Sequence, residues 1–168
     1  WYREPLQEAE IVLISVGGGD LPRMEKRFFG GECGGADNQD CLRQQLEESQ
    51  AEWDALLAEI TSLADPRRTL IRPIIPGALE YYARVYQDQP EDVKVYNSYT
   101  VALYEHMAQS CEEWGIPVLD LYALYDGPNA DPSLPEITGI GDGVHVNDEG
   151  DTVIADLLRD LGYDYASP

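Results

Sequence analysis

The stretch EIVLISVGGGD, residues 10–20, decides the fold class of this 168-residue chain. Its core, IVLISV, is an almost unbroken run of β-branched and apolar residues that stops at three glycines. Such a run is typical of a strand buried on both faces of a parallel sheet. Ligands of parallel sheets gather beyond the carboxyl ends of the strands, so the turn at residues 17–20 is a candidate binding site.

Helical and extended patterns alternate downstream of this strand. Apolar residues recur at helical spacing over 40–64 and 91–114, and apolar runs at 69–76 and 116–122 indicate two further strands. Pro73 suggests that the first of these runs lies near a strand end or at an irregular edge. A long irregular segment, 123–144, precedes a last helix over about 148–161. This alternation predicts one α/β domain, residues 1–168, with a parallel sheet and right-handed crossovers.

The segment 78–90 is aromatic and is expected to be a loop with a short helical turn. Tyr81, Tyr82 and Tyr86 lie in it. These tyrosines either line a binding cleft or pack the loop onto the domain, and the sequence leaves both interpretations open.

The chain is strongly acidic, with 32 acidic against 11 basic residues and a formal charge of −21. Nucleic acids and anionic membranes are therefore excluded as partners, because both are bound through clustered Lys and Arg. The longest apolar run is far shorter than the roughly 20 residues of a transmembrane helix. The charge itself is compatible with solubility, a saline habitat or a cationic partner.

Two of the three cysteines flank the short segment CGGADNQDC, residues 33–41. A disulfide between Cys33 and Cys41 is the interpretation we favour, with two reduced thiols as the alternative. Such a bond would indicate an oxidising compartment and hence a secreted or extracytoplasmic protein. Cys111 lies on a predicted helix and is most simply a small buried residue.

A second motif, GDGVHVNDEGDTVIADLL, occupies residues 141–158. Asp142 and His145 are close enough for one turn to place a carboxylate against an imidazole nitrogen. That pair is half of a hydrolytic triad, in which the carboxylate fixes the tautomer of the histidine that accepts a proton from a nucleophile. The alternative is an Asp at a helix entry beside a surface His.

The order of these motifs resembles the SGNH hydrolases, also called the GDSL family. Asp142, His145, Asn147 and Gly150 match the family's last block, and the turn from Gly17 to Asp20 matches an earlier one. The resemblance implies a three-layer, flavodoxin-like α/β fold with a parallel sheet. It also implies His145 as general base, Asp142 as its partner, and Gly18, Gly19 and Asp20 on the oxyanion side. The expected reaction is hydrolysis of a small ester, a lipid or an acylated sugar, without a cofactor or metal.

Two positions depart from the family pattern. Gly19 stands where the family has an oxyanion-binding Asn, and the Gly-Asp-Ser block that carries the nucleophile is not found in these residues. We expect about 50–70 N-terminal residues, or a second chain, to supply that block and complete the sheet, judged from what two strands with their crossovers require. The alternative is a catalytically inactive, acidic binding domain on the same scaffold.

Other chemistry has weaker support in the sequence. A phosphate-binding Gly-x-Gly-x-x-Gly loop at Gly17 would need glycine where Pro22 stands. Asp126, Asn129 and Asp131 could hold calcium, although such a run is more often an ordinary turn. His106 is expected on a helix face, and a zinc site built from His106, His145 and Asp142 lacks ligand spacing.

Overall fold

The computed structural model describes residues 3–16, 22–65, 68–75, 80–127 and 147–163. In chain order its elements are α1 (Arg3–Glu8), β1 (Ile11–Ser15), α2 (Pro22–Phe29), α3 (Asp40–Leu63), β2 (Leu70–Ile75), α4 (Glu80–Val85), α5 (Pro90–Glu113), β3 (Leu119–Asp120), a π-helical turn η1 (Tyr122–Asp126) and α6 (Asp148–Asp160). The predicted strands, the two long helices and the last helix are confirmed. The short helices α1 and α2 are additions to the prediction.

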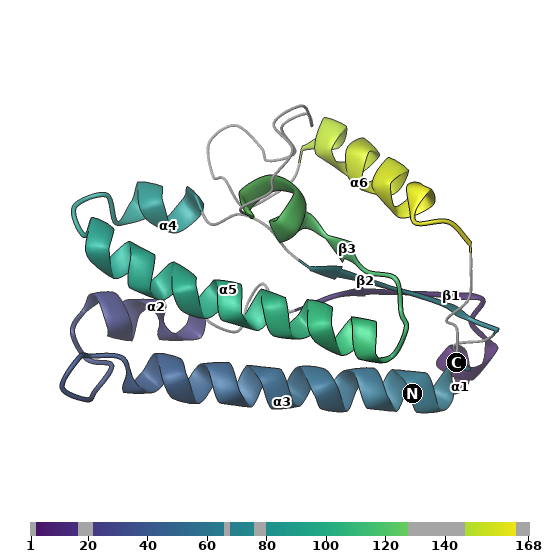
Figure 1. The fold of residues 1–168 in the computed structure, drawn as a ribbon, viewed down its shortest axis with the longest axis horizontal. Helices are drawn as coiled ribbons and strands as arrows, with labels where there is room; N and C mark the ends of the chain where they lie inside the picture. The colour runs from purple at the N-terminus through teal and green to yellow at the C-terminus, as the bar shows by residue number, and fades with distance from the viewer. Residues whose placement is uncertain (1–2, 17–21, 66–67, 76–79, 128–146, 164–168) are drawn as a thin grey trace.

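The three strands form a parallel sheet in the order β1-β2-β3, with β2 at its centre. The long helices α3 and α5 lie side by side on one side of this sheet, and α6 lies on the other (Figure 1). A parallel sheet between two helical layers makes this an α/β fold of the flavodoxin-like kind, as predicted.

The first face of the sheet is closed by α3 and α5. Val12, Ile14, Ile71 and Ile75 point into this layer. The helices contribute the most deeply buried side chains of the main core, among them Leu42, Leu57, Tyr96, Leu103 and Met107. This packing of two long amphipathic helices explains why their periodicity was readable in the sequence.

The second face is closed only in part. Leu119, Leu121 and Ile74 pack against one side of α6, through Val153, Ile154, Leu157, Leu158 and Leu161. The buried Arg72 guanidinium donates to the Gly162 carbonyl (2.9 Å) and so ties the end of α6 to β2. α6 therefore covers β2 and β3 and leaves β1 bare on this side.

The prediction that the first strand is buried on both faces is wrong for the described chain. The side chains of Ile11 and Leu13 are 54% and 58% exposed, whereas their neighbour Ile14 is buried. The reason is that β1 is an edge strand whose second face has no helix over it among the described residues.

Pro73 occupies the middle of the central strand, in register with Ile14, and not a strand end as expected. The Leu70 amide donates to the Glu10 carbonyl, so Leu70, Arg72 and Ile74 direct their backbone groups towards β1. Pro73 therefore faces the β3 side, where pairing begins only at Ile74. The missing N–H of Pro73 thus removes no ladder hydrogen bond.

The third strand is much shorter than predicted. It consists of Leu119 and Asp120, after which the chain turns into η1. The Asp120 carboxylate accepts a hydrogen bond from the Ala123 amide (2.8 Å), which favours a turn at this point.

Candidate functional site

The residues predicted to carry the chemistry lie outside the described ranges. These are Gly18, Gly19 and Asp20 after β1, and Asp142 and His145 before α6. The described elements on either side of them define how the chain enters and leaves both motifs. The carboxyl ends of the three parallel strands lie at one end of the sheet, which is where ligand sites form in such folds.

The start of α6 is fixed by a side-chain cap. Asn147, two residues after His145, accepts a hydrogen bond from the Gly150 amide through its Oδ1 (2.7 Å). The Asp151 amide donates to the Asn147 carbonyl (2.9 Å) and begins the helix. Such a cap sets a definite helix start, so the predicted Asp142–His145 motif leads into a rigid element.

A stacked aromatic pair joins the segments that follow β1 and β2. Phe29 at the end of α2 stacks on Tyr86, with ring centroids 3.6 Å apart and an interplanar angle of 6°. The Tyr86 hydroxyl also donates to the Glu25 carboxylate (2.7 Å). Because α2 follows residues 17–20 directly, this contact holds the helix next to the predicted oxyanion turn.

The aromatic segment after β2 packs onto the domain. Tyr82 is buried, and its ring lies 4.5 Å from that of Tyr96. Together with the Phe29–Tyr86 pair, this contact favours packing over a cleft wall for the two described tyrosines. The side chain of Tyr81 lies outside the described residues.

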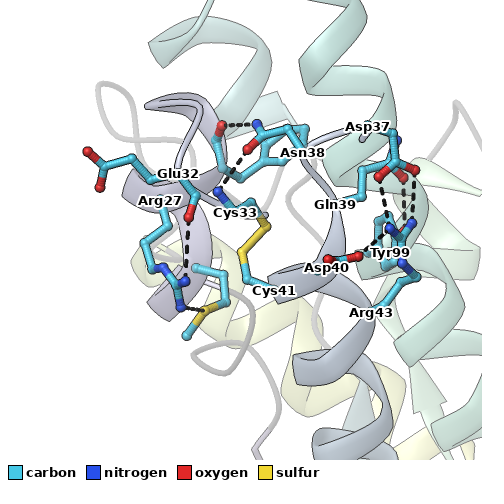
Figure 2. Close-up of a disulfide and its surroundings, with 12 residues drawn as sticks. Arg27, Glu32, Cys33, Asp37, Asn38, Gln39, Asp40, Cys41, Arg43 and Tyr99 are labelled. Carbon is cyan, nitrogen blue, oxygen red and sulfur yellow. Dashed lines mark hydrogen bonds and ion pairs between the residues drawn. A yellow bond between two sulfur atoms is a disulfide. The ribbon is translucent and has the colours of Figure 1, made fainter. Parts of the chain in front are cut away.

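Cys33 and Cys41 form the predicted disulfide, and both are buried. Figure 2 shows Asn38 beside the bridge: its Oδ1 accepts from the Cys33 amide and its Nδ2 donates to the Phe28 carbonyl, both at 2.8 Å. Asn38 has a positive φ of 56°, a conformation that Asn tolerates better than most residues. The bridge and Asn38 thus connect the end of α2 to the start of α3.

An ion-pair network lies on the outer side of the same loop. The Arg43 guanidinium donates to both carboxylate oxygens of Asp37 (3.0 and 2.8 Å) and to Asp40 (2.7 Å). The hydrogen bonds from Arg43 hold the pKa of Asp37 below its usual range. These exposed contacts order the loop but leave no acidic group poised for proton transfer.

One cluster of described residues has the composition of a triad without its geometry. The Ser110 hydroxyl donates to Asp54 Oδ1 (2.7 Å), and His106 Nε2 lies 3.0 Å from that oxygen and 3.5 Å from Ser110 Oγ. A hydrolytic triad needs one ring nitrogen for the acid and the other for the hydroxyl. Here one nitrogen faces both, so the cluster links α3 to α5 and does not activate a nucleophile.

Two hollows lie next to the sheet. The first, of about 190 Å³, lies at the end of β1 and is lined by Val16, Ser49, Glu52, Trp53, Leu56, Leu103 and Met107. The second is an open groove of about 980 Å³ along α5 and β3, with Glu105, Glu112 and Asp120 on its rim. Burial raises the pKa of the Asp120 carboxyl above its usual range.

Metal and membrane sites were sought within the described ranges. These residues contain no group of three or more His, Cys, Asp or Glu side chains that could hold a metal ion. Of the proposed calcium ligands only Asp126 lies in the described part of the chain. No helix in that part combines the length and apolar character needed to cross a bilayer.

The comparison with protein families is decisive for the class of the protein. Residues 5–158 match the family described as GDSL-like Lipase/Acylhydrolase. The chain belongs to this family. The matched residues include both the turn at 17–20 and the Asp142–His145 motif, as the sequence resemblance predicted. A search of curated proteins found no match.

Proposed function

We propose that this GDSL-family protein is an ester hydrolase of the serine type, with His145 as general base and then general acid. Asp142 would orient the imidazole and stabilise its protonated form. The observation that supports this most strongly is that one family match spans both motifs, in the order expected for the mechanism. The reaction is acyl transfer: the serine attacks the ester carbonyl, the alcohol leaves, and water then releases the acid from the acyl-enzyme.

The turn after β1 would bind the oxyanion of the tetrahedral intermediate. Gly18 and Gly19 can each offer a backbone N–H, and Asp20 ends the turn. The family's Asn side chain would be a further donor, and Gly19 stands at its position. Because one such donor is worth about 10²–10³ in rate, we expect slow turnover.

The nucleophilic serine would come from sequence outside these 168 residues. We propose that an N-terminal segment, or alternatively a second chain, brings the Gly-Asp-Ser block on a strand of the same sheet. Residues 1–168 would then belong to one SGNH-type domain. The bare edge of β1 supports this, because the run IVLISV is composed as a strand with neighbours on both sides.

The substrate class follows from the family alone: a small ester, a lipid or an acylated sugar. We further propose that the protein works in an extracytoplasmic compartment. The Cys33–Cys41 disulfide supports this, because such bonds persist mainly in oxidising surroundings.

The test is hydrolysis of p-nitrophenyl acetate by the complete polypeptide. His145→Ala should lower kcat/KM by at least about 10³-fold, because the general base is lost. The matched control is His106→Ala, which removes the other histidine of the chain from the α3–α5 cluster and should leave kcat/KM unchanged. Full activity in His145→Ala would refute the assignment.

The second candidate is an inactive, acidic binding domain, which Gly19 favours. The variant Gly19→Asn separates the two candidates. In an enzyme that lacks only this donor, the new amide should raise kcat, by up to about 10²-fold. Absence of hydrolysis in both the natural protein and Gly19→Asn would favour the binding domain.

A further inference from the structure

The outer edge of β1 presents backbone groups to solvent. In a parallel ladder, alternate residues direct both N–H and C=O to the same neighbour. The Glu10 carbonyl accepts from the Leu70 amide of β2 (2.8 Å), so Ile11, Leu13 and Ser15 direct their backbone groups the other way. No strand within the described ranges pairs with that side.

This edge lacks the features that keep free edges from pairing. Free edge strands usually carry Lys, Pro, a bulge or an inward charge. In β1 the outward residues are Ile11, Leu13 and Ser15, and the first two are more than half exposed. An apolar, uncharged edge of this kind is suited to pairing and not to permanent contact with water.

The cavity at the end of the same strand adds a second, independent observation. Its lining residue Trp53 is only 4% exposed, and its indole N–H is buried without a hydrogen-bond acceptor. Buried donors are rarely left unpaired, because the lost hydrogen bond to water is not replaced. A volume of about 190 Å³ is also sufficient for an aromatic ring, since apolar cavities of roughly 150 Å³ bind benzene.

We propose that a further β-strand of the same polypeptide pairs with Ile11, Leu13 and Ser15, and that it brings a large apolar side chain and an acceptor for Trp53 Nε1 into this cavity. The inference rests on the proposed function, because this strand is the one expected to carry or adjoin the nucleophile. A second copy of the chain is a poorer occupant, since each copy carries a charge of −21 and the two would repel. A tethered segment avoids that repulsion and acts at high effective concentration.

Hydrogen exchange tests the edge. In the 168-residue chain, the outward amides of Ile11, Leu13 and Ser15 should exchange at least about 10²-fold faster than those of Val12 and Ile14, which face β2. In the polypeptide translated from its initiator methionine, the two sets should be protected to a similar degree. Outward amides that remain fast in the complete polypeptide would overturn the proposal.

A substitution pair tests whether the docking is specific. Leu13→Glu should restore fast exchange at the outward amides of the complete polypeptide and leave the melting temperature of the 168-residue chain almost unchanged. The matched control is Val85→Glu, the same kind of change at an exposed position away from this edge. If protection already exists in the 168-residue chain and light scattering finds a dimer, the occupant is a second copy and the proposal is wrong.

Trp53→Phe tests the cavity through the sign of its effect. In the 168-residue chain it removes an unpaired buried donor and should leave the melting temperature equal or higher. In the complete polypeptide it removes a hydrogen bond to the docked strand and should lower the melting temperature. Trp114→Phe, at an exposed position, should shift neither. The same sign in both proteins would overturn this part, and because no measurement uses activity, failure of the ester hydrolase function is detected separately.

Discussion

The two faces of the sheet differ in how completely they are covered. On the α3–α5 side, Val12 and Ile14 of β1 pack into the main core, whereas Ile11 and Leu13 of the same strand lie exposed on the α6 side. Yet all four residues are apolar. A run such as IVLISV therefore records the surroundings of the strand in the working protein, and one covered face accounts for only half of the pattern.

The largest expected effect comes from a matched pair of leucines on the two faces. Leu57→Ala, at a fully buried position of α3, should lower the free energy of unfolding by about 2–5 kcal/mol. Leu13→Ala on the bare face should change that free energy by no more than about 0.5 kcal/mol in the 168-residue chain. Urea unfolding of both variants measures the contrast, and equal losses would contradict a difference between the faces.

The disulfide should be the next largest contribution, and it lies beside the closed face. Replacing both Cys33 and Cys41 by Ala removes the constraint on a short loop and should cost about 2–3 kcal/mol of unfolding free energy. Urea unfolding under non-reducing conditions measures this loss.

A thiol count is the control for that result. Cys111 is fully buried, and burial raises the pKa of its thiol to about 12. The folded, unreduced protein should therefore react with no equivalent of a thiol reagent at pH 8, and the unfolded, unreduced protein with one. Three reactive thiols after unfolding would mean that the bridge is absent.

Features repeated over many residues could be predicted from the sequence. The α3 and α5 periodicities extend over 24 residues each, and the short Cys33–Cys41 spacing indicated the bridge. The motif residues Asp142 and His145 could be named because their spacing is local. Their placement depends on contacts that no local pattern contains.

The errors have local physical causes. The run from 116 to 122 has the composition of a strand, but the Asp120–Ala123 hydrogen bond ends β3 after two residues. Helix α2 was missed because its core contacts come from the neighbouring aromatic residues Phe28 and Phe29 at its end, which produce no helical spacing. The bare face of β1 could not be predicted, because the sequence records the preference of a strand and not whether a partner is present.

On the α6 side, a smaller effect is expected from the helix cap. Asn147→Ala removes the acceptor of the Gly150 amide and should cost about 1 kcal/mol of unfolding free energy. Asn147→Asp, which keeps an acceptor, is the matched control and should retain most of the stability. If Asn147→Asp loses as much as Asn147→Ala, the cap is not the cause.

The smallest effect concerns Asp120, at the β3 end of the sheet. Burial raises the pKa of this carboxyl, so the folded protein binds its proton more tightly than the unfolded chain. The stability that the group contributes is therefore greatest below its unfolded pKa and is lost as the pH rises through the folded pKa. Asp120→Asn keeps an oxygen that can accept from Ala123 and does not ionise. Its melting temperature relative to the natural protein should thus rise between pH 3 and pH 7, with a gain of at most about 0.5 kcal/mol. Asp88→Asn, an equal change in net charge at an exposed position, corrects for general repulsion. A difference that is flat with pH after this correction would mean that the Asp120 carboxylate is as well solvated at the edge of the sheet as in the unfolded chain.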